Sequence, residues 1–169
     1  MEIFSSRRIT RIGITAAVYV VVTFMCSSFA YQSVQFRVSE ALMLLCFYNK
    51  DYIISVSIGC LISNIFSTIG VADTFVGTAA TVISGALIYF FRKEDSTSRL
   101  VLCSFIPVVI NALFVGAEII LLSHEPLSFL SVALSVALGE FVCVTVLGTL
   151  MIKAFEKSPA IMKCVKEKY

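Results

Sequence analysis

Six apolar stretches, separated by short polar breaks, dominate the pattern of the chain. They cover about residues 12–30, 38–48, 52–69, 74–91, 100–122 and 127–155. Most are close to the roughly 20 residues that a helix needs to cross the ~30 Å hydrocarbon core of a bilayer. The pattern therefore predicts an all-α integral membrane protein, with a bundle of six transmembrane helices forming a single domain over residues 1–169.

The two ends of the pattern need separate interpretation. The first apolar stretch could be a secretory signal peptide, because Ser28-Phe29-Ala30 resembles a small-x-small cleavage site. That stretch is about 19 residues long, however, which suits an uncleaved first span better. At the other end, Ser158 as cap and Pro159 in the first turn predict a short amphipathic cytoplasmic helix near residues 159–168, whose lysines suit a membrane surface.

Composition supports the membrane assignment. Of the residues, 59% are hydrophobic and 14% are charged, and the mean hydropathy is +0.97; soluble domains carry about 25% charged residues. The net charge of +2 gives no reason to expect a nucleic acid partner. The six cysteines lack Cys-x-x-Cys spacing and a neighbouring histidine. They are interpreted as small apolar residues, and no metal site is expected.

Positive charges are distributed unevenly along the chain. If both termini are cytoplasmic, twelve of the thirteen lysines and arginines fall on the cytoplasmic side of the predicted spans. The exception is Arg37, which would lie on the outside. A multi-pass protein with both termini in the cytoplasm is therefore predicted, and the position of Arg37 indicates a functional role.

Charged and amide side chains within the apolar segments are the candidate functional groups. In the predicted topology they lie between the outer face and the midplane of the membrane, on five of the segments. Ionisable residues at such depth are costly unless they are paired, hydrated or bound to a ligand. The candidates for substrate binding are Arg37, Glu40, Asn64, Asp73, Asn111, Glu118 and Glu140, with Phe36, Phe75 and Phe114 as candidates for stacking.

The charges of this group do not balance. Its four carboxylates face one guanidinium, so the site would carry a net charge of −3 if all were ionised. A cationic substrate would offset that charge, and carboxylates and amides also match the N–H groups of a guanine-like ring. The alternative interpretation is a buried network without a ligand, in which Arg37 pairs with Glu40 or Glu118 and fixes helix packing.

Small residues indicate where helices can pack closely, and the absence of known enzyme motifs narrows the candidate functions. Gly13-x-x-x-Ala17 and Gly77-x-x-x-Thr81-x-x-x-Gly85 leave flat surfaces on which helices can approach closely. The sequence contains no Walker-type phosphate loop, no His-Glu-x-x-His and no Gly-x-Ser-x-Gly. No catalytic residue and no cofactor of this chain are therefore predicted. An intramembrane hydrolase with paired carboxylates, or a structural subunit without a ligand, is the alternative function.

Four blocks of the sequence carry a family resemblance. They are residues 35–42 (QFRVSEAL), residues 59–64 (GCLISN), residues 73–81 (DTFVGTAAT), and Asn111-Ala112 together with Glu118. In these blocks the chain resembles the QueT-type queuosine-precursor transporters, substrate-binding (S) components of energy-coupling factor (ECF) transporters. The resemblance covers residues 12 to about 150, which is nearly all of the predicted membrane part.

The resemblance implies a six-helix S component in the plasma membrane of a prokaryote. It would capture a 7-deazaguanine from outside, either 7-aminomethyl-7-deazaguanine or queuine; another small cationic or purine-like vitamin is the alternative. Its partners besides the lipid bilayer would be a membrane scaffold subunit and two cytoplasmic ATPases, which use the ATP. The scaffold would dock on a small-residue face of the first helix, here Gly13, Ala16 and Ala17, which departs from a cleaner Ala-x-x-x-Ala pattern.

Overall fold

The computed structural model describes residues 5–26, 36–66, 71–93, 96–122 and 128–167, and these parts of the chain are helical throughout apart from short turns. The possible cleavage site Ser28-Phe29-Ala30 and Gln35 lie outside the described residues. The elements are α1 (Ser6–Met25), the 3-10 helix η1 (Val38–Phe47), α3 (Asp51–Ile65), α4 (Val71–Phe91), α5 (Thr97–Leu122), α6 (Phe129–Glu140), the π-helix η2 (Phe141–Gly148), α7 (Thr149–Glu156) and α8 (Pro159–Lys166).

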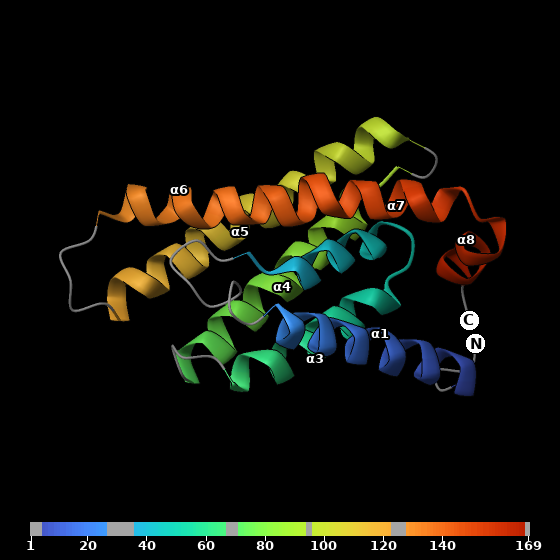
Figure 1. Ribbon diagram of the computed structural model, residues 1–169, viewed down its shortest axis with the longest axis horizontal. Coiled ribbons are helices and arrows are strands. Elements are labelled where there is room, and N and C mark those ends of the chain that lie inside the picture. Colours follow the sequence, from blue (N-terminus) through green and yellow to red (C-terminus); the bar gives the residue numbers. More distant parts are fainter. Residues whose placement is uncertain (1–4, 27–35, 67–70, 94–95, 123–127, 168–169) are drawn as a thin grey trace.

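Four of the described helices are long and apolar enough to cross a membrane. They are α1, α4, α5 and the continuous helix of α6, η2 and α7, which runs along one side of the bundle in Figure 1. The other two apolar elements, η1 and α3, have 10 and 15 residues. At 2.0 and 1.5 Å per residue each is about 20 Å long, shorter than the hydrocarbon core. The six-span arrangement therefore stays a prediction.

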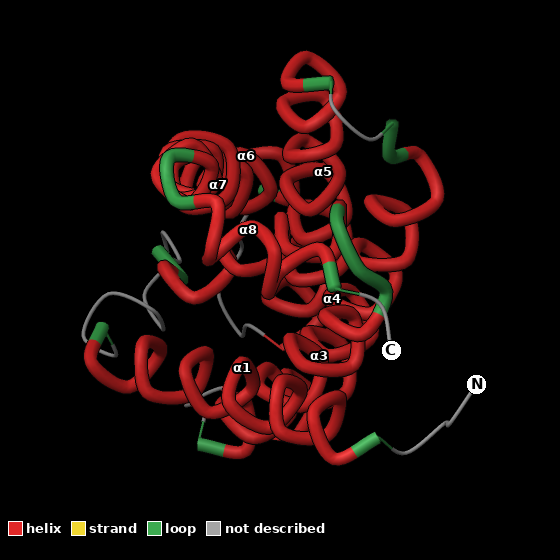
Figure 2. The backbone as a smooth tube through the Cα atoms, turned by 90° about the vertical axis from the view of Figure 1, so that its right-hand side faces the viewer, coloured by secondary structure: helices red, strands yellow, loops and turns green. Residues whose placement is uncertain are grey.

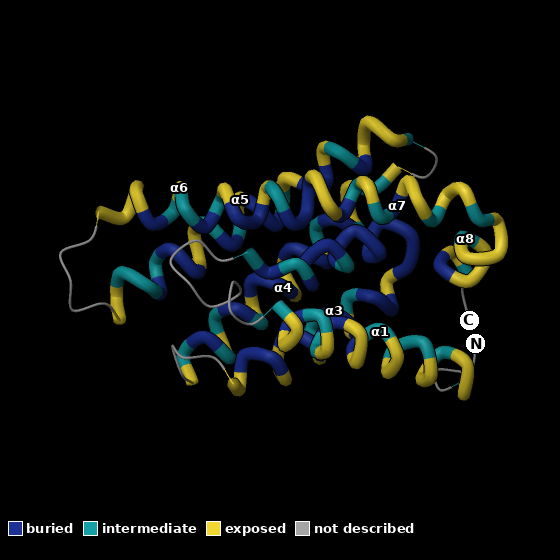
Figure 3. Tube along the Cα trace, in the orientation of Figure 1, coloured by how far each residue is buried: buried dark blue, intermediate teal, exposed yellow. Residues whose placement is uncertain are grey.

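The short helix η1 lies in the core of the bundle. Met43, Leu44 and Cys46 in η1 have no exposed surface, and Figure 3 shows this segment dark blue between the exposed outer surfaces of α1 and α6. It contacts α1, α3, α4, α5, η2 and α7. Runs of 3-10 helix longer than three or four residues are uncommon because their hydrogen bonds are poorly aligned. Packing from all sides is what stabilises this one.

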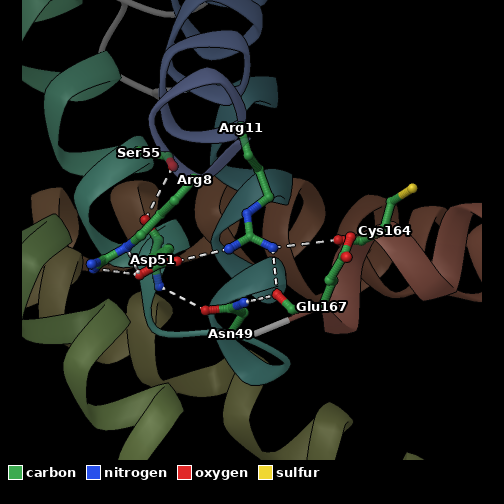
Figure 4. Close-up of polar contacts among 7 residues, drawn as sticks. All are labelled: Arg8, Arg11, Asn49, Asp51, Ser55, Cys164 and Glu167. Carbon is green, nitrogen blue, oxygen red and sulfur yellow. Dashed lines mark hydrogen bonds and ion pairs between the residues drawn. The ribbon is translucent and has the colours of Figure 1, made fainter. Parts of the chain in front are cut away.

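A polar cluster connects the first and last helices at one end of the bundle (Figure 4). The carboxylate of Asp51 forms ion pairs with Nη2 of Arg8 and with Nη2 of Arg11, both at 2.7 Å. Nη1 of Arg11 also donates to the backbone carbonyl of Glu167 at 2.5 Å, and Nδ2 of Asn49 donates to the same carbonyl at 2.6 Å. The start of α1, the turn before α3 and the end of α8 are therefore held together.

The tail helix α8 packs on this end of the bundle. Val165 is buried in the main hydrophobic core, with Met162 packed against it. In the end-on view of Figure 2, α8 covers the middle of this end, between α1 and α7. The sequence analysis placed the lysines of this helix at a membrane surface, which stays a prediction, and the structure adds that Val165 faces the core of the bundle. Pro159 begins the helix as predicted, but Ser158 makes no side-chain capping hydrogen bond.

Replacing Asp51 by Asn tests the polar cluster. Asp51 is 3% exposed and neutralises two arginines, so the substitution leaves both guanidiniums without their carboxylate. Breaking a buried ion pair on one side costs about 3 to 5 kcal/mol, and the partial exposure of the arginines reduces this to about 2 kcal/mol. We expect a lower thermal unfolding temperature of the purified protein in detergent.

The matched control is Glu156→Gln, which removes one negative charge from an exposed residue at the end of α7. It should leave the unfolding temperature nearly unchanged. Equal unfolding temperatures for the two variants would show that the Asp51 cluster does not stabilise the fold.

Candidate functional site

Ionisable residues from four elements are buried inside the bundle. Arg37 immediately precedes η1, and the four acidic residues belong to η1, α4, α5 and α6. The exposed fractions are 6% for Arg37, 1% for Glu40, 0% for Asp73, 4% for Glu118 and 5% for Glu140. Buried charges must be paired, hydrogen-bonded or neutralised, since each is costly when isolated. Their mutual geometry therefore indicates what the site can bind.

Arg37 forms an ion pair with Asp73. The distance from Nη2 of Arg37 to Oδ2 of Asp73 is 3.9 Å, a pair that the sequence analysis had not expected. Asn64 on α3 supports it, because its Nδ2 donates to the backbone carbonyl of Asp73 at 3.0 Å. Three elements, η1, α3 and α4, are thus connected through this part of the site.

The thiol of Cys60 lies at the centre of this group. Its sulfur accepts from Nη1 of Arg37 at 3.8 Å, from Nδ2 of Asn64 at 3.3 Å and from Oγ1 of Thr81 at 3.2 Å. Sulfur is a weak acceptor, so these contacts orient the donors more than they stabilise the fold. All six cysteines are free thiols, but the purely apolar role that the sequence analysis assigned to Cys60 is wrong.

Two further acidic residues complete the site from α5 and α6. Glu140 is hydrogen-bonded by Asn111 and interacts electrostatically with Glu40 and Arg37. Glu118 lies seven residues after Asn111, on the same buried face of α5. All of the residues predicted to bind a substrate are therefore buried, and the charged ones lie within electrostatic range of Arg37.

Glu118 lies near the Arg37–Asp73 pair. It interacts electrostatically with Asp73 and with Arg37. Within the described part of the chain, neither of its two buried carboxylate oxygens has a hydrogen-bond partner. Glu118 is therefore an acceptor with both oxygens available to a ligand or to water.

Other acceptors in the site have the same property. Among the described residues, Oε2 of Glu40, Oε2 of Glu140, Oδ1 of Asp73 and Oδ1 of Asn64 also lack a hydrogen-bond partner. A buried acceptor left without a donor costs about 1 to 3 kcal/mol. The cluster is therefore short of hydrogen-bond donors, and water or a ligand rich in N–H groups would satisfy it.

The three phenylalanines predicted as candidates for stacking differ in exposure. Phe75 is 70% exposed, because it lies two residues from buried Asp73 and so points to the opposite side of α4. The prediction that Phe75 stacks on a ligand is wrong. Phe114 is 37% exposed and Phe36 is half-buried, and stacking by these two stays a prediction.

The three docking candidates on α1 do not share one face. Gly13 and Ala17 are exposed, whereas Ala16 is 5% exposed and faces the interior of the bundle. A residue one position from Ala17 is rotated by about 100° around the helix axis. The exposed small-residue surface of α1 therefore contains Gly13 and Ala17 but not Ala16.

The structure adds polar residues that the sequence analysis did not select. The hydroxyl of Tyr19 on α1 donates to Oε1 of Glu40. One turn further along α1, the hydroxyl oxygen of Thr23 lies 2.6 Å from that of Ser39. Both residues of α1 lie within an apolar run, and their spacing of four residues on one helix face was the available signal.

Apolar helices around a buried, donor-poor cluster of acidic residues define a membrane protein with an internal polar site, as found in transporters. The model of the QueT transporter family matches residues 9–157 of this chain. The chain belongs to the QueT transporter family. That membership confirms the prediction of a transporter and not an enzyme.

One relative can be compared directly. The queuosine precursor transporter QueT of Lactococcus lactis subsp. cremoris (strain MG1363) is 45% identical over 92 residues. The aligned segment covers 52% of this chain and 54% of the relative, so the match spans about half the length of that protein. No solved structure shows significant similarity to the chain.

The close approach of α4 to Asn64 gives a test of the site's packing. A Cβ at Gly77 would lie 2.5 Å from Nδ2 of Asn64 and 3.3 Å from Oδ1 of Asp73. Gly77→Ala should therefore displace Asn64 and destabilise the protein by about 1 to 3 kcal/mol, the usual cost of overpacking. Thermal unfolding in detergent measures the change.

Gly13→Ala is the matched control. A Cβ at Gly13 meets nothing within 4 Å, and alanine is favoured over glycine inside a helix by about 0.5 to 1 kcal/mol. This variant should unfold at the same or a slightly higher temperature. If Gly77→Ala behaved like Gly13→Ala, the close packing of Asn64 against α4 would be contradicted.

Proposed function

We propose that this chain is the substrate-binding membrane subunit for uptake of a queuosine precursor of the 7-deazaguanine class. The buried, donor-poor cluster around Arg37 and Glu118 is the observation that carries the proposal. The QueT family assignment and the name of the relative from Lactococcus lactis support the same substrate class.

The chemistry of a 7-deazaguanine matches the acceptors of the site. One carboxylate can accept two parallel N–H bonds, and Glu118 has both oxygens available for the N–H edge of the base. The amine of 7-aminomethyl-7-deazaguanine or of queuine adds a positive charge, which suits the neighbouring carboxylates of Glu140 and Glu40. The ligand would thereby offset the negative charge of the carboxylates that Arg37 does not neutralise.

The arrangement of the helices supports uptake from outside. The α8 end of the bundle holds Arg8, Arg11 and the start of α3, and lysines and arginines favour the cytoplasmic side. Asn64 lies 13 residues further along α3 than Asp51, which is about 20 Å at 1.5 Å per residue. With both termini in the cytoplasm and six crossings, the acidic site would lie in the outer half of the membrane.

Energy for transport would come from partner proteins. As an ECF S component, the chain would associate with a membrane scaffold subunit and two cytoplasmic ATPases. The exposed small-residue surface at Gly13 and Ala17 supports close approach of a partner helix to α1. The chain itself would bind and release the substrate, and ATP would be used by the ATPases.

Isosteric removal of each charge tests the binding role. Glu118→Gln and Glu140→Gln keep the size of the side chain but replace an acceptor oxygen by an N–H₂ group. Hydrogen bonds to charged groups contribute about 1.5 to 3 kcal/mol, so each variant should bind 7-aminomethyl-7-deazaguanine about 10- to 100-fold more weakly in isothermal titration.

Glu156→Gln is the control for this experiment because Glu156 is exposed at the end of α7. It should bind like the wild-type protein, and all variants should insert into the membrane. Wild-type affinity in both Glu118→Gln and Glu140→Gln would exclude these residues from the binding site.

Enlarging the small-residue surface of α1 tests the docking role separately. Ala17→Leu fills the flat surface and should abolish uptake by cells while leaving ligand affinity of the purified chain unchanged, since Ala17 faces away from the site. Ala79→Leu makes the same change on the exposed face of α4 and should leave uptake intact. Uptake that is normal in Ala17→Leu would contradict docking at this surface.

A further inference from the structure

Tyr19 lies on the side of α1 that faces the interior of the bundle. Ala16, Tyr19 and Thr23 are the buried residues of α1, and Tyr19 has no exposed surface. Their spacing of three and four residues places them on one face. Gly13 and Ala17 lie on the exposed part of the same helix. Tyr19 therefore lies on the buried face of α1, on the other side of the helix from the small-residue surface.

The hydroxyl of Tyr19 joins two parts of the acidic site. It donates to Oε1 of Glu40 and lies close to the thiol of Cys60. Cys60 in turn receives Nη1 of Arg37. The phenol of Tyr19 therefore lies between Glu40 and Cys60. The sulfur of Cys60 in turn orients Arg37.

The ring of Tyr19 is fixed by the backbone of α3. A Cβ at Gly59 would lie 2.7 Å from Cβ, 2.8 Å from Cγ and 2.9 Å from Cδ1 of Tyr19. Such distances are well below van der Waals contact, so the ring occupies the space that a side chain at position 59 would take. The position of the hydroxyl therefore depends on how α1 packs against α3.

We propose that Tyr19 is the positioning residue through which α1 controls the ligand affinity of the site. This inference rests on the proposed function. By holding Oε1 of Glu40, the phenol leaves Oε2, which has no partner among the described residues, as the oxygen for the ligand. The phenol thus fixes the direction of the Glu40 carboxylate.

The position of Tyr19 gives this contact a regulatory consequence. A shift of α1 away from α3 would withdraw the hydroxyl from Glu40 and let the carboxylate rotate out of its binding orientation. A partner that docks on Gly13 and Ala17 acts on the same helix from its exposed side.

A double-mutant cycle tests this inference on the full-length purified chain, with 7-aminomethyl-7-deazaguanine as the ligand. Tyr19→Phe keeps the ring packed on Gly59 and removes only the hydroxyl. We expect it to weaken binding about 10-fold in the wild-type background, in line with a hydrogen bond to a charged group. In the Glu40→Gln background the same change should weaken binding less than about 2-fold, because Tyr19 acts through Glu40.

Tyr48→Phe is the matched control. The hydroxyl of Tyr48 also donates to a glutamate, Oε1 of Glu156 at 3.3 Å, but this pair lies outside the acidic site. Its removal should leave ligand affinity unchanged. If Glu40→Gln binds the ligand too weakly to complete the cycle, the ligand affinities of Tyr19→Phe and Tyr48→Phe are compared instead. Equal affinities of these two variants would contradict the inference.

The outcomes separate the two proposals. Equal loss from Tyr19→Phe in both backgrounds would show that the phenol does not act through Glu40, and the inference would fail while the proposed function stands. Absence of binding by the folded wild-type protein would overturn the proposed function itself. If Tyr19→Phe does not fold, Gly59→Ala displaces the ring instead and should weaken binding only when Glu40 is present.

Discussion

The cost of burying charge inside an apolar helical bundle is the constraint on which this structure depends. A charged side chain at the centre of a membrane span costs about 2.5 to 3.5 kcal/mol on insertion scales. Arg37 offsets part of this cost through Asp73 and Cys60, and Tyr19 does so for Glu40. For the two oxygens of Glu118, the cost of burial is not offset until a ligand or water donates hydrogen bonds to them. This residual demand for donors favours a ligand site over a network that serves packing alone.

The position of these charges depends on an unusual central helix. As a 3-10 helix, η1 is about 20 Å long with 10 residues, whereas an α-helix of the same residues would be about 15 Å long. It packs against η2, where a Cβ at Gly148 would lie 3.0 Å from Cδ1 of Leu44 and 3.2 Å from the carbonyl oxygen of Ala41. Close packing at this glycine holds η1 against η2, and Glu40 in η1 interacts electrostatically with Glu140, which directly precedes η2.

The sequence predicted the helices and selected most members of the buried polar cluster, because apolar runs and the charged residues within them are both visible in one dimension. It could not predict that Arg37 pairs with Asp73, since this requires the rotation of α4 relative to η1. The same rotation turns Phe75 outward, and the rotation of α1 buries Ala16. The spacing of Tyr19 and Thr23 on one face of α1 was the available signal, but it does not identify Glu40 and Ser39 as their partners.

Isothermal titration of the folded wild-type chain tests the central claim most directly. 7-Aminomethyl-7-deazaguanine and queuine are titrated in parallel with guanine and riboflavin. The account predicts submicromolar binding of a deazaguanine and much weaker binding of guanine, which lacks the positively charged aliphatic amine that the acidic residues around Arg37 would bind. No binding of either deazaguanine, by protein that unfolds cooperatively, would contradict the assignment of this site to a queuosine precursor.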